Sequence, residues 1–205
     1  FMTNLVDHLK LAKNDKILDL PCGKGRHAIF LHEKGFNTTG ADLSENSIKY
    51  AKQFEKAGLN FDIHDMRNPL KGSYDAIFNL FTSFGYFNQE TTNIKILKNF
   101  KNALRPGGHI VIDFLNLEKV IENLVPEQHI SKKGIDFTIR KNVSDNFIIK
   151  KIIVKHKQEV HHYIEKVQAL DLDKMKLFTK AAGLEIQEIF GDYDLNPFNK
   201  SHSER

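Results

Sequence analysis

Three acidic residues end or directly follow short segments that have the composition of β-strands. Asp19 ends KILD, Asp42 ends NTTGAD, and Asp65 follows NFDIH. The carboxyl ends of parallel strands meet at one edge of a sheet, where open α/β sheets bind their ligands. Carboxylates at this edge are suited to three groups of a ligand: a positive amino group, a pair of ribose hydroxyls and the exocyclic amine of adenine.

A glycine-rich turn follows the first of these acidic residues. The stretch GKGRHA, residues 23–28, satisfies the pattern G-x-G-x-x-[GA], which is typical of dinucleotide sites. Gly23 and Gly25 would let the backbone approach a ligand closely. A carboxylate at Asp19, four residues before Gly23, would face the negative diphosphate of a dinucleotide. The acidic residue therefore favours a cofactor that has an ammonium group and no phosphates.

The first half of the chain alternates short apolar runs with amphipathic stretches. Helices are expected over roughly 26–34, after an N-cap at Ser44, and across the apolar positions 94–104, where RPGG at 105–108 ends the last of them. The expected strands are 16–20, 37–42, 60–64, 74–80 and 109–115. This alternation predicts an α/β fold, a Rossmann-like doubly wound sheet covered by helices.

The pattern changes after Asn116. Between Phe137 and Leu170 the chain is rich in β-forming residues, without helical periods and with short polar breaks typical of hairpin turns. A last helix at 173–182 and a strand LEIQEIF at 184–190 are expected to follow. We predict a single domain over 1–205, in which an antiparallel β insertion at 129–170, after the fifth strand, forms a lid on the substrate side.

Composition narrows the class of protein. The 205 residues are 40% hydrophobic and 27% charged, with a net charge of +4 and one cysteine. These values indicate a soluble globular protein in a reducing compartment, for which we expect a cytoplasmic location without a membrane span or secretory signal. Because Phe1 precedes the first methionine, we expect the chain to be part of a longer one.

Together, these motifs resemble the class I S-adenosylmethionine-dependent methyltransferases, in the branch that acts on small molecules. The likeness covers about residues 16–114 and is weaker beyond them. At one position the sequence departs from the family, because Pro21, followed by Cys22, stands where a glycine is common. The motifs that carry the resemblance are ILDLPCGKGRH, ADLS, HDMR, FNLFTSFGYF and LRPGGHIVID.

The resemblance implies that S-adenosylmethionine is the cofactor and S-adenosylhomocysteine the product. Asp19 would lie near the amino group of the methionine moiety, Asp42 would accept the ribose hydroxyls, and Asp65 with the Met66 backbone would bind adenine. The N-terminus of the helix after the turn offers free N–H groups to the carboxylate of the cofactor. The implied cofactor-binding residues are Asp19, Leu20, Pro21, Cys22, Gly23, Gly25, Asp42, Leu43, Asp65, Met66, Arg67, Asn79 and Leu80.

The acceptor is expected to be a small molecule. Phe81, Phe84 and Tyr86 follow the fourth strand, where ligand crevices form, so they are candidate substrate-binding residues. Residues 78–87 lack the N/D-P-P-Y signature of enzymes that methylate exocyclic amines of nucleic-acid bases, which disfavours a nucleic-acid substrate. The sequence identifies neither the methylated atom, nor a general base, nor the oligomeric state.

Other interpretations of single residues remain open. Cys22 has the chemistry of a nucleophile, but no partner arrangement supports that role. Arg26 and His27 would contact substrate or face solvent equally well.

Two further features are explained more simply by surface exposure. His156, His161 and His162 have a spacing that matches no tight metal site, and no metal is predicted. The eight Lys and Arg residues between Lys132 and Lys157 are typical of a solvated edge hairpin, with an anionic substrate or RNA as the alternative. A non-catalytic S-adenosylmethionine- or nucleotide-binding module and an RNA methyltransferase are the alternative functions.

Overall fold

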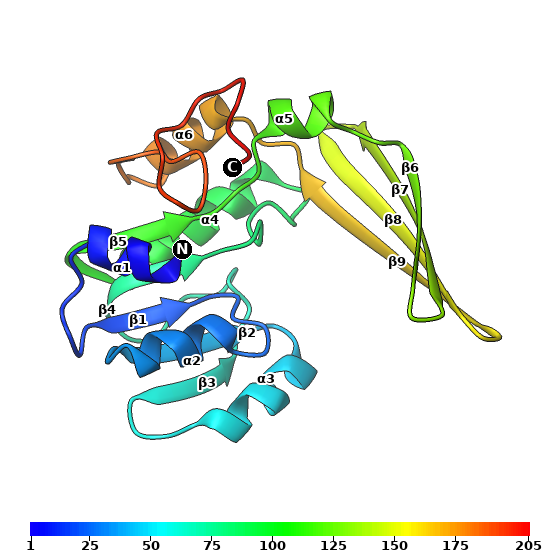
Figure 1. Cartoon of the computed structure of the whole chain (residues 1–205). Coiled ribbons are helices and arrows are strands. Elements are labelled where there is room, and N and C mark those ends of the chain that lie inside the picture. Colours follow the sequence, from blue (N-terminus) through cyan, green and yellow to red (C-terminus); the bar gives the residue numbers. More distant parts are fainter.

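The computed structural model describes residues 1–205 and contains two separate β-sheets (Figure 1). In the first, five parallel strands lie in the order β3-β2-β1-β4-β5. The order reverses between β1 and β4, and such a switch point opens a ligand crevice at the carboxyl ends of the strands. The strands are β1 (Lys16–Asp19), β2 (Asn37–Asp42), β3 (Leu59–Ile63), β4 (Tyr74–Asn79) and β5 (Leu104–Ile112).

Helices cover both faces of this sheet. Ile17 and Phe78 on one face pack with Met2 of α1 and Leu31 of α2. On the other face, Leu18 and Ile77 belong to a core cluster shared with α4 and α6. The prediction of a doubly wound α/β fold is therefore confirmed. The helices are α1 (Met2–His8), α2 (Arg26–Glu33), α3 (Glu45–Ala51) with the short 3-10 helix η1 (Lys52–Phe54), α4 (Glu90–Asn102) and α6 (Leu172–Ala181).

The fifth strand begins earlier than the sequence pattern predicts. It starts at Leu104, directly after α4, so RPGG lies within the strand and the expected start at His109 is wrong. The pairing of β5 with β4 is irregular between Tyr74 and Ala76. A Cβ atom on Gly108 would lie 2.9 Å from the Asp75 carbonyl oxygen, so this close approach of the two strands requires glycine.

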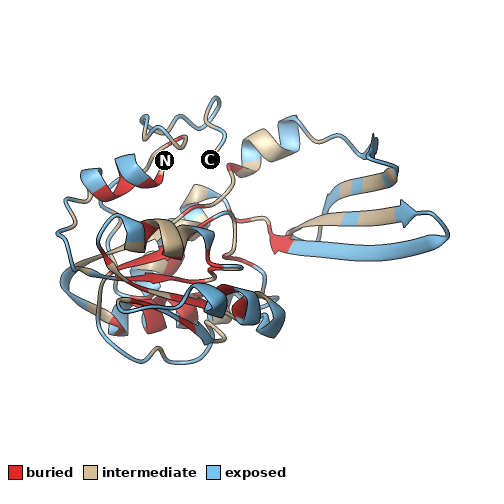
Figure 2. Cartoon of the chain, turned by 60° about the horizontal axis from the view of Figure 1, so that its bottom comes forward, coloured by how far each residue is buried: buried red, intermediate tan, exposed pale blue.

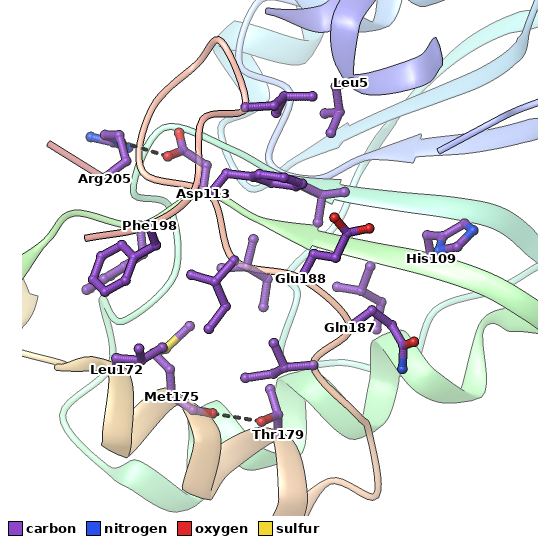
Figure 3. A pocket seen from close by; sticks show the side chains of 18 of the residues that line it. Leu5, His109, Asp113, Leu172, Met175, Thr179, Gln187, Glu188, Phe198 and Arg205 are labelled. Carbon is purple, nitrogen blue, oxygen red and sulfur yellow. Dashed lines mark hydrogen bonds and ion pairs between the residues drawn. The ribbon is translucent and has the colours of Figure 1, made fainter. Parts of the chain in front are cut away.

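The predicted strand at 184–190 is not formed. This segment makes only an isolated bridge between Phe190 and Pro197. A groove with a volume of about 640 Å³ and a largely apolar lining separates it from β5 (Figure 3). The alternation of LEIQEIF is that of a strand, but its backbone groups find no ladder partner across the groove. None of the predicted cofactor-binding residues lines this groove.

The second sheet is an antiparallel arm that extends away from the rest of the molecule (Figures 1 and 2). It follows α5 (Leu117–Glu122), and we refer to residues 127–168 as the arm. Only Val167 and Gln168, at its base, are buried. The predicted antiparallel insertion after the fifth strand is confirmed. The strands are β6 (Glu127–Lys132), β7 (Ile135–Ser144), β8 (Phe147–His156) and β9 (Glu159–Gln168), paired in this order.

The base of the arm is fixed at the carboxyl side of the parallel strands (Figure 1). The Gln168 amide N–H donates to the Gly85 carbonyl oxygen at 2.8 Å, and Asn93 Nδ2 of α4 donates to Gln168 Oε1 at 2.5 Å. The arm thus begins beside the loop that follows β4. That it acts as a lid stays a prediction.

None of the helices combines the length and the apolar composition that a membrane crossing requires.

Candidate functional site

Two buried oxygen atoms without a hydrogen-bond partner lie at the carboxyl ends of β1 and β4. They are Asp19 Oδ2 and Asn79 Oδ1, on side chains that are 1% and 0% exposed. The two strands are hydrogen-bonded neighbours, and Asn79 Nδ2 donates to the Leu20 carbonyl oxygen at 2.7 Å. A buried acceptor without a donor costs about 1–3 kcal/mol. This edge of the sheet is therefore suited to a ligand that brings hydrogen-bond donors.

The Asp19 carboxyl is also perturbed in its ionisation. Burial, reinforced by the negative charge of Asp42, raises its pKa from 3.8 to about 7, although the Ala28 backbone N–H and the charge of Arg26 oppose the rise. Burial disfavours the charged form of a carboxyl unless a positive partner is close. An ammonium group bound here would restore the carboxylate and satisfy its free oxygen.

The two glycines of the turn between β1 and α2 have different surroundings. Both have positive φ, +56° at Gly23 and +86° at Gly25. A Cβ atom on Gly25 would lie 2.7 Å from the Phe61 ring, whereas one on Gly23 would meet no atom within 4 Å. Gly25 is thus required by packing. Gly23 faces open space, as expected for backbone over which a ligand can lie.

The Asp42 carboxylate is held in a fixed orientation at the end of β2. Its Oδ2 accepts from the Gly23 amide and its Oδ1 from the Ser44 amide, each at 2.8 Å. Ser44 also caps α3, as predicted, by accepting from the Ser47 amide at 3.3 Å. Each carboxylate oxygen keeps lone-pair capacity for a further donor, such as a ribose hydroxyl. Leu43, next in the chain, is 62% exposed beside it.

Asp65, after β3, is already engaged with a neighbouring cation. The Arg67 guanidinium donates to both of its oxygens at 2.5–3.0 Å, and hydrogen bonding from Arg67 lowers the pKa of the Asp65 carboxyl. An adenine amine would have to share this carboxylate with Arg67. The Met66 carbonyl oxygen accepts from Asn99 Nδ2 at 3.2 Å, which ties this loop to α4.

The aromatic residues after β4 separate into two environments. Phe84 is fully buried in the core cluster beneath the loop. Phe81 and Tyr86 are 45% and 47% exposed. Two of the three candidate substrate-binding residues thus present surface to a ligand, while the position of Phe84 favours a packing role. Leu80, which precedes them, is buried under α1 and α2.

Phe81 is the centre of a cluster that sequence reasoning largely missed. The His27 ring stacks on it at 5.0 Å with an interplanar angle of 10°, and the Arg26 guanidinium lies 5.3 Å from its centre. Phe81 has a φ of +56°, a strained value for a residue other than glycine. Asp113 Oδ2 holds it there by accepting from the Phe81 amide at 2.8 Å.

Asp113 is fixed in turn from the C-terminal segment. Arg205 Nε donates to Asp113 Oδ1 at 2.7 Å (Figure 3). The Tyr193 hydroxyl donates to Asp113 Oδ2 at 3.1 Å. Asp19 and Asp42 are the last residues of β1 and β2, and Asp113 directly follows β5. The signal was missed at Asp113 because the expected strand at 109–115 ran past it.

The ionisation states at the turn separate two candidate reactive groups. Burial, followed by the charge of Arg26, lowers the pKa of the His27 imidazole, whose Nε2 accepts from the Arg26 guanidinium at 3.1 Å. Burial and the charges of Asp19 and Asp42 raise the pKa of the Cys22 thiol far above neutrality. A thiol that stays protonated is a poor nucleophile, so the structure favours a packing role for Cys22. No group of three or more His, Cys, Asp or Glu side chains is arranged to hold a metal ion.

The parallel sheet has a switch point, a glycine turn after its first strand and acidic residues at its strand ends. Together these features define a class I S-adenosylmethionine-dependent methyltransferase. A family model described as a methyltransferase domain matches residues 11–174, so the chain belongs to this family. It is 34% identical over 116 residues to the putative methyltransferase YqeM of Bacillus subtilis, a match that covers 55% of this chain and 47% of YqeM. Glycine N-methyltransferase of Oryctolagus cuniculus is 29% identical over 125 residues, which cover 52% of this chain and 42% of that protein. The chain thus matches less than half the length of either relative.

Solved structures show the same fold. An S-adenosylmethionine-dependent methyltransferase from Clostridium acetobutylicum superimposes with a TM-score of 0.87 at 21% identity, over 99% of this chain and 85% of that one. The CcbJ methyltransferase of Streptomyces caelestis gives 0.84 at 18% identity, over 98% and 85%. Both superpositions include the arm, because they span nearly all of this chain.

Proposed function

We propose that this protein transfers a methyl group from S-adenosylmethionine to a small-molecule acceptor by direct in-line displacement. The observation that carries the proposal is the pair of unpartnered buried oxygens, Asp19 Oδ2 and Asn79 Oδ1, beside the open backbone of Gly23. An ammonium donor and a ligand without phosphates match this arrangement, whereas a diphosphate would be repelled by Asp19.

The residues of the site would bind the cofactor in parts. Asp19 and Asn79 would accept from its ammonium group, and Asp42 from its ribose hydroxyls. Asp65, Met66 and Arg67 border the adenine side, and Leu20, Pro21 and Cys22 shape the turn. S-adenosylmethionine supplies, when bound, a methyl group that is already activated by the sulfonium. The protein then has mainly to align the reactants and exclude water, an effect worth roughly 7–11 kcal/mol.

The acceptor would lie on the side of Phe81 and Tyr86. The Gln168 amide at the base of the arm donates at 2.8 Å to the carbonyl oxygen of Gly85, the residue before Tyr86, and this contact supports the arm as a wall of the acceptor pocket. The His27 ring is stacked on Phe81, but its Nε2 already accepts from the Arg26 guanidinium at 3.1 Å, so we assign no general base. A neutral amine acceptor would need none.

The similarity results are consistent with a small acceptor. Relatives are named as glycine and glycine/sarcosine N-methyltransferases, and one structural neighbour is described as an amino pentose methyltransferase. We therefore favour an amine acceptor on an amino acid or amino sugar.

A methyl-transfer screen tests the proposal. The protein is incubated with S-adenosylmethionine carrying a labelled methyl group and with separate pools of amino acids, amino sugars, nucleosides and RNA. Label in a small amine is the expected result, and Asp19→Asn should reduce it strongly at a cofactor concentration that only just saturates the parent. Tight cofactor binding without transfer to any pool would indicate a non-catalytic binding module instead. Transfer to RNA alone would indicate an RNA methyltransferase.

A further inference from the structure

The loop after β4 contains two consecutive residues in a strained backbone conformation. Phe81 and Thr82 have φ of +56° and +54°, values that residues with a bulky or β-branched side chain rarely adopt. The other consecutive pair without glycine, Asp145 and Asn146, forms the turn between β7 and β8, where a two-residue hairpin favours positive φ. Phe81 and Thr82 instead follow a strand of the parallel sheet. Such a conformation persists only where other groups hold it, and it is common at functional sites.

A single residue, Asp113, holds the backbone amides of both strained residues. Its Oδ2 accepts from the Phe81 amide at 2.8 Å, and its backbone carbonyl oxygen accepts from the Thr82 amide at 3.0 Å. Its own amide donates to the Asn79 carbonyl oxygen at 2.9 Å, which continues the pairing of β5 with β4. Asp113 is thus fixed by the sheet, and it determines the path of the chain over the three residues that follow Asn79.

The Asp113 carboxylate is buried and already occupied by donors. Its Oδ1 accepts from Arg205 Nε, and its Oδ2 accepts from the Tyr193 hydroxyl as well as from Phe81. Figure 3 shows the Arg205 side chain directed at this carboxylate. Arg205 Nη2 also donates to Thr82 Oγ1 at 2.9 Å, so one guanidinium contacts both the carboxylate and the strained loop. Asp113 therefore acts through the loop and not directly on a bound molecule.

The group that this arrangement orients is the Phe81 ring. The ring is partly exposed, with the His27 ring stacked on it at 5.0 Å and the centre of the Tyr193 ring 5.7 Å from its own. His27 belongs to the first turn of α2, directly after the glycine turn, and Phe81 stands two positions after Asn79, whose Oδ1 has no partner. The ring thus lies beside both elements that border the proposed place of the cofactor, with part of its surface free.

We propose that Asp113 is a positioning residue for methyl transfer, which fixes the Phe81 ring as the surface against which the acceptor lies. The inference rests on the proposed function, which places the acceptor beside Phe81. Transfer in line requires the acceptor to stay aligned with the methyl group, and a misplacement of about 1 Å costs on the order of 100-fold in rate. Loss of the Asp113 side chain should therefore impair transfer, although it changes no residue that binds the cofactor.

A fluorescent reporter tests whether Asp113 fixes the ring. The chain contains no tryptophan, so Phe81→Trp places a single indole at this position. Adding Asp113→Ala should shift the indole emission to longer wavelength and increase its quenching by acrylamide, because the ring is released from its neighbours.

Asp75→Ala is the matched control. Asp75 also accepts from a backbone amide, that of Lys16, and from the Arg105 guanidinium, but it lies at the amino end of the sheet. In the Phe81→Trp protein this change should leave the emission as it is.

Steady-state kinetics tests what the fixed ring does. With the small amine that takes up label in the methyl-transfer screen, Asp113→Ala should lower kcat about 100-fold and raise the KM for the amine. The affinity for S-adenosylhomocysteine, measured by isothermal titration calorimetry, should stay that of the parent. A purely structural role would instead lower activity through the folded fraction and leave the KM for the amine unchanged.

Asp113→Asn keeps the test decisive if Asp113→Ala does not fold. The asparagine has the same shape and keeps an oxygen for the Phe81 amide, but its NH₂ group would meet the Arg205 donor. Its kcat and its indole emission should therefore lie between those of the parent and of Asp113→Ala, and parental values of both would contradict the proposal.

The outcomes separate this proposal from the function on which it rests. Unchanged indole emission in Asp113→Ala, unchanged kcat, or an equal loss of kcat in Asp75→Ala would overturn the positioning role. A parent that labels no amine would overturn the proposed function and the acceptor role of Phe81, whereas the emission still decides whether Asp113 fixes the ring.

Discussion

The two sheets of this protein depart from ordinary burial in opposite directions. The parallel sheet, covered by helices on both faces, encloses polar oxygens of Asp19 and Asn79 that have no partner. The arm presents Ile130, Tyr163 and Ile164 to water, and each of its two faces carries both apolar and charged side chains. The departure in the parallel sheet indicates a missing component of complementary chemistry, a ligand with hydrogen-bond donors. The mixed faces of the arm indicate no such single component.

The two sheets also differ in whether their notable residues favour folding. Asp19 in β1 is the only acidic residue of a strand whose other side chains include the fully buried Ile17 and Leu18, and its charge is unfavourable for folding alone. The isoleucines of β8 are favourable for strand formation yet remain partly exposed in the single chain. Variants that act on one region and spare the other test whether the two are independent.

Gly23→Val should have the largest effect on the cofactor. A β-branched side chain would fill the open space above the turn, and the φ of +56° would be strained as well. Affinity for S-adenosylmethionine, measured by isothermal titration calorimetry, should fall more than 100-fold. The matched control is Gly134→Val in the turn between β6 and β7, where φ is +75° and a Cβ also meets no atom within 4 Å. Equal losses of affinity in both variants would mean that backbone strain, and not the cofactor, explains Gly23.

Asp19→Asn should lower affinity and raise stability together. Loss of the carboxylate removes a charge-assisted contact to the ammonium group, and affinity should fall roughly 10- to 100-fold, or about 1.5–3 kcal/mol. In the free protein the same change removes a buried charge. The rise of the pKa from 3.8 to about 7 corresponds to about 4 kcal/mol, which is an upper limit for the stability gained.

The pH dependence of stability follows from the direction of that pKa change. Folded Asp19 binds its proton more tightly than the unfolded chain does, so its contribution to the parent's stability is lost as pH rises from about 4 to about 7. The difference in urea-unfolding free energy between Asp19→Asn and the parent should therefore grow across this window and level off above it. A difference that is constant with pH would contradict the buried, proton-binding carboxyl.

Asp42→Ala should reduce cofactor affinity at least tenfold while the fold stays intact. It removes an acceptor for the ribose hydroxyls, together with the two backbone contacts that orient it. Asp75→Ala is a suitable control, since Asp75 also accepts from a backbone amide, that of Lys16, but at the amino end of the sheet. Calorimetry should show normal affinity in the control. An unchanged affinity of Asp42→Ala would mean that the ribose lies elsewhere.

Local patterns predicted most of the parallel sheet. Apolar runs bounded by Gly and Asp define β1 to β4 to within a few residues, and the cap at Ser44 was visible because N-capping depends on adjacent residues alone. The prediction of a strand at 184–190 was wrong because the alternation of apolar and polar residues does not indicate whether a pairing partner is present. The start of β5 was misplaced because the pairing with β4 overrides the turn character of RPGG.

Long-range contacts explain what sequence reasoning missed at the site. The support of Phe81 comes from Asp113, Tyr193 and Arg205, which are 32 to 124 positions away along the chain. Phe81 and Phe84 lie two and five residues after the end of β4, and the turn between them directs Phe84 into the core. Which aromatic faces the ligand is thus decided by the path of the loop, which has no periodicity to reveal it.

Cys22→Ser should have the smallest effect on methyl transfer, because Cys22 is expected to shape the turn and not to react. Cys22 packs in the cluster of Phe61, Ile48 and Ala28, and its protonated thiol has no catalytic partner. The Gly23 carbonyl oxygen, 3.5 Å from Sγ, offers an acceptor to a serine hydroxyl of similar volume. The serine variant should lose about 1–3 kcal/mol of stability, because a hydroxyl replaces a thiol among apolar side chains. Its transfer rate should stay within a few-fold of the parent, since methyl passes from sulfonium to acceptor without a covalent enzyme intermediate. Alkylating reagents should inactivate the parent only slowly, in proportion to transient opening of the turn. A folded serine variant that binds the cofactor normally but transfers no methyl would make the cysteine the working group of this turn.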